Sequence, residues 1–432
     1  MSDKMQDGIE SSAPPIRETP KRKDWQSCAA RVDDGCFPEP TVIDMEKMNV
    51  RKIEEVHHAG EGYSMRSRAA YERNVGNFAP SIALINPMTE CLEIRGDTPT
   101  NEEWDVLGAH FHNVKKLYVS TGFHECWVDD RFPLNWPLEF LMISDATGEL
   151  VQTPAILEGL VPHVVLYLTC NLMFEGPSSD QLSKTDEDAM TTFPGKDGAT
   201  DPGVEIVNRP ELVIKWMDDD HSEKTISLFD TVVMEAEKPS RLKKLEILGN
   251  DAVDAVQRLL LAKDHLIFGL EHLNLRSAGY NDFYSGTHIL IAALAHMPNL
   301  KQLELTLEGI EPNEPIVKDL LTCLPPNLEH LWFRGPVGLA KDPVFREWIE
   351  VFRVGTLPTS LKSVCVALDM LTRRTLAPVE ELRTAKVACE ELLGAARARG
   401  ISVEEPFDHW ANIIRIFPQI DGRWASLSTE TS

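Results

Sequence analysis

The phrase Leu270-Glu-His-Leu273-Asn-Leu275 recurs twice in the chain, as Leu300-Lys-Gln-Leu303-Glu-Leu305 and as Leu328-Glu-His-Leu331-Trp-Phe333. The three copies share the pattern L-x-x-L-x-(L/F), and their starts are 30 and 28 residues apart. Alternating apolar positions are typical of a β-strand with one buried face. A strand pattern that recurs at a nearly constant interval predicts a fold built from stacked repeats.

The same alternation continues on both sides of these copies. It occurs earlier at residues 91–94, 117–119, 141–143 and 166–168, then at 212–216 and 242–247, and later at 361–368 and 401–403. Helix signals lie between the strands: Thr100-Asn-Glu-Glu103 is a capping box, and Asp342-Pro343 joins an N-cap residue to a proline suited to the first helical position. Helices are predicted over residues 251–263, 286–296, 315–324, 343–352 and 378–399. The sequence therefore predicts strand and helix in alternation over residues 89–405.

The remaining segments complete the predicted domain organisation. Residues 1–38 and 426–432 are predicted to be disordered tails, and residues 39–88 a helical N-terminal cap with helices near 44–58 and 64–78. A flexible acidic insertion is expected at 176–210, because this stretch is polar and too long for an ordinary connection between repeats. Residues 406–425 contain enough apolar side chains to form a C-terminal cap.

The overall charge restricts the classes of partner. The chain of 432 residues has 68 acidic and 43 basic residues, a formal net charge of −25, which disfavours binding to nucleic acid or to an anionic membrane surface. The first residues lack the apolar core of a secretory signal, and the eight scattered cysteines include no C-x-x-C pair. We expect a cytoplasmic protein, with Lys21-Arg22-Lys23 as a weak nuclear-import signal.

At these strand phrases the chain resembles the intracellular leucine-rich repeat proteins with long, helix-containing repeats, especially the divergent fungal F-box/leucine-rich-repeat adaptors. The resemblance covers residues 89–405 and implies an α/β leucine-rich repeat solenoid with a curved parallel sheet inside and helices outside. It also implies that the concave face or its loops capture a protein. In the F-box members the N-terminal helices connect the protein to a ubiquitin ligase, but residues 39–88 show no convincing F-box pattern.

Residues between the leucines are expected to line the concave face, because neighbouring side chains of a strand point to opposite faces. Tyr167 is placed with Tyr118 and Met142 in the central row of that face. Aromatic and basic side chains there favour partner binding, and the predicted partner-binding residues are Tyr118, Phe140, Met142, Tyr167, His272, Arg276, His330, Trp332 and Arg334. The alternative is that the insertion or a tail folds across the face and covers them.

Motifs for enzyme chemistry are mostly missing from the sequence. It contains no phosphate loop, no dinucleotide fingerprint, no G-x-S-x-G and no H-E-x-x-H. His110-Phe-His112 with His124-Glu-Cys126 offers zinc-ligand types but no familiar zinc spacing, and Asp218-Asp-Asp-His221 favours a solvated turn.

We therefore expect no metal and no cofactor, and a non-enzymatic protein-interaction scaffold whose oligomeric state is open. A ubiquitin-ligase adaptor with a degenerate F-box is the first alternative, and an enzyme with an unrecognised site is the second. The scaffold hypothesis predicts that Trp332→Ala with Arg334→Ala abolishes partner capture while the melting temperature stays nearly unchanged.

Overall fold

The computed structural model divides the chain into two compact units, residues 1–39 and residues 40–432. Only parts of the second unit are described below. These are residues 40–45, 51–55, 68–72, 75–96, 99–120, 135–146, 154–168, 205–208, 212–217, 223–229, 240–249, 252–277, 287–310, 315–371, 377–406, 420–424 and 426–427.

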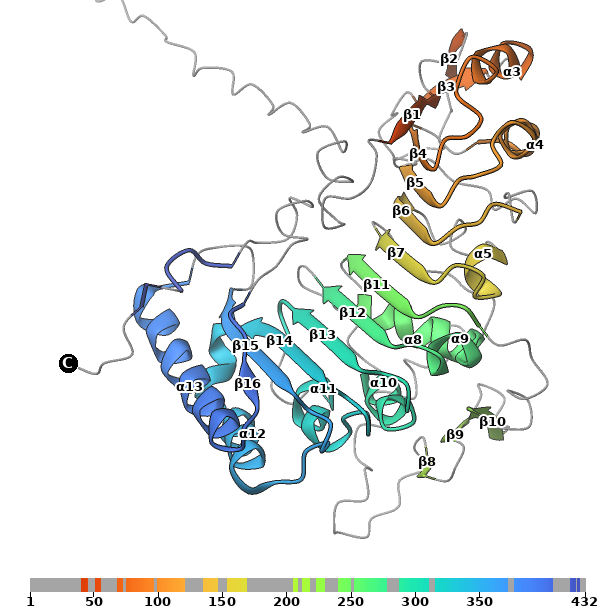
Figure 1. Ribbon diagram of the computed structural model, residues 1–432. Helices are drawn as coiled ribbons and strands as arrows, with labels where there is room; N and C mark the ends of the chain where they lie inside the picture. The colour runs from red at the N-terminus through yellow and green to blue at the C-terminus, as the bar shows by residue number, and fades with distance from the viewer. Residues whose placement is uncertain are drawn as a thin grey trace, which may run out of the picture. The chain divides into compact units, whose positions relative to one another are not determined.

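The second unit is organised by one sheet of 11 strands whose order in space follows their order in the chain (Figure 1). Every neighbouring pair in this sheet is parallel. The strands are β1 (Thr41–Asp44), β4 (Cys91–Arg95), β5 (Lys116–Ser120), β6 (Phe140–Ala146), β7 (His163–Leu168), β11 (Lys244–Gly249), β12 (His272–Ser277), β13 (Gln302–Leu307), β14 (His330–Pro336), β15 (Ser363–Met370) and β16 (Ser402–Val403). The fold is thus α/β with a large parallel sheet, as the alternation of strand and helix signals predicts.

One face of this sheet, the first face, is apolar and is covered by helices (Figure 1). The leucines of each phrase lie there in register, so that Leu273, Leu303 and Leu331 are aligned across β12, β13 and β14 and are nearly inaccessible to solvent. The helices are α3 (Val75–Ile82), α4 (Asn101–His110), α5 (Pro154–Leu157), α8 (Ala252–Ala262), α9 (Asp264–Phe268), α10 (Thr287–Leu294), α11 (Pro315–Lys318), η2 (Leu320–Thr322), η3 (Val337–Lys341), α12 (Pro343–Val354) and α13 (Val379–Ala398). One hydrophobic core runs along the sheet because each strand contributes to it.

The predicted helix starts are confirmed where the sequence has capping chemistry. The Thr100 side chain accepts a hydrogen bond from the Glu103 amide, and the Glu103 carboxylate accepts one from the Thr100 amide at 2.7 Å. The Asp342 carboxylate accepts a hydrogen bond from the Val344 amide at 2.9 Å, directly before α12. These contacts satisfy amide donors that a helix cannot satisfy within its first turn.

The prediction of a purely helical N-terminal cap is wrong. Arg51–Glu55 (β2) and Arg68–Glu72 (β3) form a two-stranded antiparallel sheet, and the helix Val75–Ile82 follows them. The parallel sheet also begins before residue 89, because Thr41–Asp44 pairs with β4. Spacing that resembles a helical period over 44–58 does not exclude a strand, since Arg51–Glu55 contains a single apolar residue, Ile53, and so defines neither period.

Residues 212–216 are not a strand of the main sheet, contrary to the prediction. Leu212–Met217 (β9) lies between Glu205–Asn208 (β8) and Glu223–Leu228 (β10) in a separate antiparallel sheet. Consequently β7 pairs directly with β11, although 75 residues, 169–243, lie between them in the chain. Of the predicted insertion 176–210, only residues 205–208 are among the described ones. Near the end of this segment, Phe229 packs against Phe268, with the ring centroids 5.7 Å apart.

The predicted C-terminal cap is described only at its end, because residues 407–419 lie outside the described residues. Trp424 is 3% exposed and belongs to the hydrophobic core, and the Lys386 ammonium of α13 is 5.0 Å from the centroid of its ring. Of the predicted tails, 1–38 and 426–432, only residues 426 and 427 are described, and Leu427 packs against the hydrophobic core. No helix in the described part of the chain is long and apolar enough to cross a membrane.

Candidate functional site

The opposite face of the sheet, which we call the second face, bears the residues between the leucines. They form three rows across the strands. The first row includes Lys116, Phe140, His163, Lys244, His272, Gln302, His330 and Ser363; the central row Glu93, Tyr118, Met142, Val165, Glu246, Asn274, Glu304, Trp332 and Cys365; and the third row Arg95, Ser120, Ser144, Tyr167, Leu248, Arg276, Thr306 and Arg334. Eight of the nine predicted partner-binding residues lie in their expected rows.

Tyr167 is the exception, because the predicted register of β7 is displaced by two residues. Tyr167 pairs with Ser144 and Leu248 and so lies in the third row, while Val165 takes the central position beside Met142. The segment His163-Val-Val-Leu-Tyr-Leu168 is apolar at five consecutive positions, so alternation alone does not define its register.

The second face over β4–β7 is closely packed, with buried aromatic and apolar side chains beside the buried Glu93 and Lys116. Tyr118, Phe140, Met142 and Tyr167 are all buried. The Phe140 ring lies 5.1 Å from the Tyr118 ring and 4.8 Å from the His163 ring, measured between centroids, and the Lys116 ammonium is 5.9 Å from the Phe140 centroid. These predicted binding residues therefore pack on one another along the sheet. The insertion and tails invoked as alternative covers lie outside the described residues, apart from 205–208 and 426–427.

A buried polar network joins β7, β11 and β12 and lies between the β4–β7 and β11–β16 parts of the second face. The Glu246 side chain is 1% exposed, and its Oε1 lies 2.9 Å from His163 Nε2 and 3.0 Å from the Lys244 ammonium. Its Oε2 accepts a hydrogen bond from Asn274 Nδ2 at 2.9 Å. Burial by itself would raise the pKa of Glu246, but the hydrogen bond from His163 and the charge of Lys244 hold that pKa well below its usual range. Glu246 is therefore a buried carboxylate that neutralises Lys244.

The next strand pair repeats this arrangement closer to solvent. His272 Nε2 lies 3.2 Å from Glu304 Oε1, and the Gln302 amide donates a hydrogen bond to the same oxygen at 2.7 Å. The His272 and Glu304 side chains are 15% and 11% exposed. Among the described residues, the second carboxylate oxygen of Glu304 makes no hydrogen bond or ion pair.

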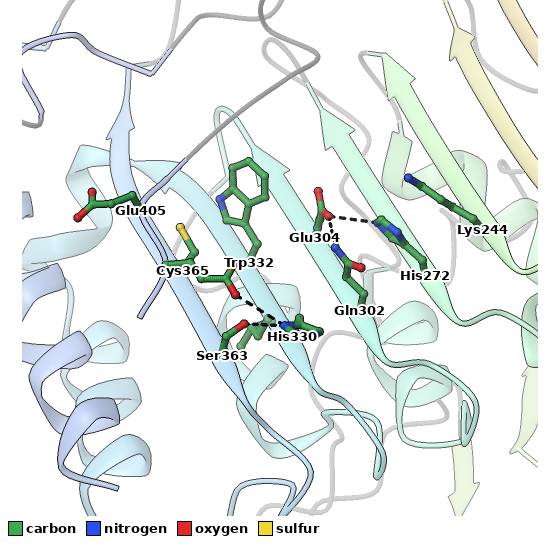
Figure 2. A pocket seen from close by; sticks show the side chains of 11 residues that line it. Lys244, His272, Gln302, Glu304, His330, Trp332, Ser363, Cys365 and Glu405 are labelled. Carbon is green, nitrogen blue, oxygen red and sulfur yellow. Dashed lines mark hydrogen bonds and ion pairs between the residues drawn. The ribbon is translucent and has the colours of Figure 1, made fainter. Parts of the chain in front are cut away.

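A pocket of about 500 Å³ opens on the second face over β11–β15 and the residues that follow β16 (Figure 2). Trp332 stands on β14 between Glu304 of β13 and Cys365 of β15, because these three residues are in register. Glu404 and Glu405, which follow β16, are exposed and complete the wall beyond Cys365. Among the described residues, the buried indole Nε1 of Trp332 has no hydrogen-bond partner.

His330 is more exposed than His272, the other predicted histidine of the pocket. Its Nδ1 lies 2.6 Å from the Ser363 hydroxyl and 3.7 Å from Glu404 Oε1, and its side chain is 42% exposed. Its Nε2 lies 4.0 Å from Glu329 Oε2. Ser363, His330 and Glu329 thus lie next to one another, but the 4.0 Å between His330 Nε2 and Glu329 Oε2 exceeds hydrogen-bond length. Burial raises the pKa of the Cys365 thiol to about 12, so this thiol is protonated at neutral pH.

Two predicted binding residues are buried arginines. Arg334 is 1% exposed and forms two hydrogen bonds to the Asp369 carboxylate, at 2.7 and 2.8 Å. The same carboxylate accepts a hydrogen bond from the Asp421 amide at 2.8 Å, which fastens the C-terminal segment to β15. Arg276 is also 1% exposed, and its Cζ is 5.9 Å from the Trp332 ring centroid. The expectation that Arg334 can be removed without loss of stability is therefore revised: its position is structural.

The weak zinc hypothesis gains no support from the described residues. His110 Nε2 lies 2.8 Å from the Ile85 carbonyl oxygen, which accounts for this ring nitrogen. His124 and Cys126 lie outside the described residues, as do residues 218–221. Within the described residues no group of three or more histidine, cysteine, aspartate or glutamate side chains is arranged to hold a metal ion.

No protein-family model matches the chain, and no curated protein is similar to it at a significant level. Any functional conclusion therefore depends on the chemistry of the second face.

Proposed function

We propose that the chain is a leucine-rich repeat solenoid that acts as a non-enzymatic protein-interaction scaffold, with the second face over β11–β16 as its binding surface. Two observations support the solenoid. The strand order follows the chain throughout the main sheet, and the leucines of successive strands are in register on one helix-covered face. Each repeat then contacts mainly its neighbours and leaves its inter-leucine residues available for recognition.

The observation that carries the binding proposal is Trp332 in its pocket. It is partly exposed within a concave site of about 500 Å³, and its buried Nε1 has no partner among the described residues. Tryptophan is among the residue types that dominate binding energy at protein interfaces, and its N–H normally has a partner when buried. The exposed part of the Trp332 ring is therefore the surface that a partner chain would contact.

The ubiquitin-ligase adaptor is the first alternative. An adaptor would need an N-terminal helical unit that projects from the solenoid. Instead, Thr41–Asp44 extends the parallel sheet next to β4, and Phe78 and Ile82 of α3 belong to the common core. This integration of the described N-terminal residues favours the plain scaffold.

An enzyme is the second alternative, and its best candidate centre is Ser363 with His330. Ser363 is 3% exposed, which leaves its hydroxyl poorly placed to attack a substrate. The protonated Cys365 thiol offers no better nucleophile. These features favour binding over catalysis.

The proposal is tested by affinity capture from a cell extract with the full chain and with Trp332→Ala, followed by quantitative mass spectrometry. Trp332→Ala should reduce recovery of at least one protein about tenfold or more, because a buried interface tryptophan contributes about 2 kcal/mol or more. Val354→Ala is the matched control, since Val354 is 84% exposed at the end of α12. Equal recovery by all three proteins would refute the binding surface.

A further inference from the structure

We propose that the pocket around Trp332 recognises a cationic side chain, arginine or lysine, in an extended segment of a separate partner protein. This inference rests on the proposed function and specifies the chemistry of its partner. It follows from the balance of charge in the pocket, from the indole at its centre and from the size of the cavity.

The pocket carries an excess of negative charge. Glu304, Glu404 and Glu405 line it, whereas the lysine and arginine charges beside it are those of Lys244 in the lining and of the buried Arg276 against the Trp332 ring. The Lys244 ammonium is 3.0 Å from the buried Glu246 carboxylate, so its charge is already compensated. A cation entering the pocket gains attraction from carboxylates on two sides, while an anion is repelled.

The indole supplies a second kind of recognition for a cation. The Trp332 ring already lies 5.9 Å from the Arg276 guanidinium carbon, at the distance of a cation–π contact. The same side chain lines the pocket, between Glu304 on one side and Cys365 on the other (Figure 2). Aromatic rings flanked by carboxylates favour arginine and lysine over uncharged side chains, because the cation interacts with both.

The dimensions fit a side chain with its peptide better than a lone ion. A volume of about 500 Å³ is in the range of sites for small organic ligands. The first row presents His272, Gln302 and His330 side by side, at equivalent positions of three neighbouring strands. A peptide crossing the strands would therefore meet hydrogen-bonding groups along the edge of the pocket while one basic side chain enters it.

Binding of a labelled hexa-arginine peptide to the full-length protein, measured by fluorescence anisotropy, tests the proposal. Trp332→Ala should weaken binding about fivefold to tenfold, the size of a partly desolvated cation–π contact. Glu404→Gln with Glu405→Gln should also weaken it about fivefold and should reduce its salt dependence. A hexa-glutamate peptide should not bind measurably.

A matched variant separates the pocket from the general acidity of the chain. Glu380→Gln with Glu381→Gln removes an adjacent pair of glutamates from the start of α13, at the same total charge as the pocket variant. Its affinity for hexa-arginine should equal that of the unaltered protein. Equal weakening by both double variants would show only bulk attraction and would overturn the proposal, as would tight binding of hexa-glutamate.

The chain's own basic run provides the remaining control. If Lys21-Arg22-Lys23 occupied the pocket, replacing all three with alanine would raise the affinity for hexa-arginine and overturn the assignment to a separate partner. Unchanged affinity supports it. If Trp332→Ala abolishes capture of proteins from the extract but leaves hexa-arginine binding unchanged, the cationic assignment fails and the scaffold proposal stands. If it changes neither, both fail.

Discussion

The two halves of the second face share one register but differ in chemistry. Over β4–β7 the rows include Tyr118, Phe140 and Met142 together with Glu93 and Lys116, and all five side chains are buried. Over β11–β16 the equivalent positions hold ion pairs, an indole and a pocket of about 500 Å³. A single strand pattern thus produces a closely packed, buried surface in one half and a recessed surface with a pocket in the other. The repeated leucines set the backbone, and the residues between them decide whether the surface is closed or available.

The largest effect that would test this contrast is expected at Arg334, which lies in the β11–β16 half but is buried. Arg334→Ala leaves the Asp369 carboxylate buried without its cation and should lower the free energy of unfolding by about 3–5 kcal/mol. Urea denaturation measures this change. Arg383→Ala, which removes an exposed pair with Glu380, should cost less than about 1 kcal/mol. Similar costs for the two variants would mean that the Arg334 pair does not anchor this half.

The next effect concerns the β4–β7 half. Phe140→Ala removes a ring that is 3% exposed and contacts Tyr118 and His163, so we expect a loss of about 3 kcal/mol by the same measurement. A change below about 1 kcal/mol would contradict the description of this half as a packed layer and would return Phe140 to the set of candidate binding residues.

A smaller effect is expected for Trp332→Ala. Its side chain is partly exposed beside a pocket, so its removal should change the free energy of unfolding by about 1 kcal/mol. The two unfolding free energies can be compared directly, because Trp332→Ala and Phe140→Ala each remove an aromatic side chain from the second face. A cost as large as that of Phe140→Ala would assign Trp332 to the packed structure.

The smallest effect is a difference in pH dependence at the boundary between the halves. Burial lowers the pKa of His163 below its ordinary value of 6.5. Below pH about 6.5 the unfolded chain therefore binds a proton that folded His163 does not, so stability should fall as pH falls towards the folded pKa. In His163→Gln, the free energy of unfolding should fall less steeply between pH 7 and pH 5 than in the unaltered protein. The control His112→Gln alters an exposed histidine, and an identical slope change in both variants would contradict the assignment.

Sequence patterns predicted the strands best where leucine alternated with polar residues. The copies at Leu273, Leu303 and Leu331 form neighbouring strands in the expected register, and Asp342-Pro343 begins a helix. Patterns failed where alternation was ambiguous or where pairing depended on distant residues. The apolar run around Tyr167 permitted two registers, and residues 212–216 have strand composition but pair outside the main sheet. No local signal distinguishes these outcomes.

The candidate site was predicted in part. The positions of His272, His330 and Trp332 on one face followed from alternation. The burial of Arg276 and Arg334 did not, because it depends on long-range contacts such as the pairing of Arg334 with Asp369, 35 residues later. Glu404 and Glu405 were missed as pocket residues, since they follow the last short strand and reach the site only through the pairing of β16 with β15.

The order of the strands also bears on how the molecule opens. Each interior strand of the main sheet hydrogen-bonds only to the strands before and after it in that sheet, so strands can be released one at a time from either end. The two-residue strand β16 forms one end, and β15 is bound beyond it to the Asp421 amide through Asp369. Amide hydrogen exchange should therefore form a gradient, fastest in β16 and β1 and slowest near β12. Local unfolding from the C-terminal end of the sheet would therefore disrupt the pocket before the central strands unfold.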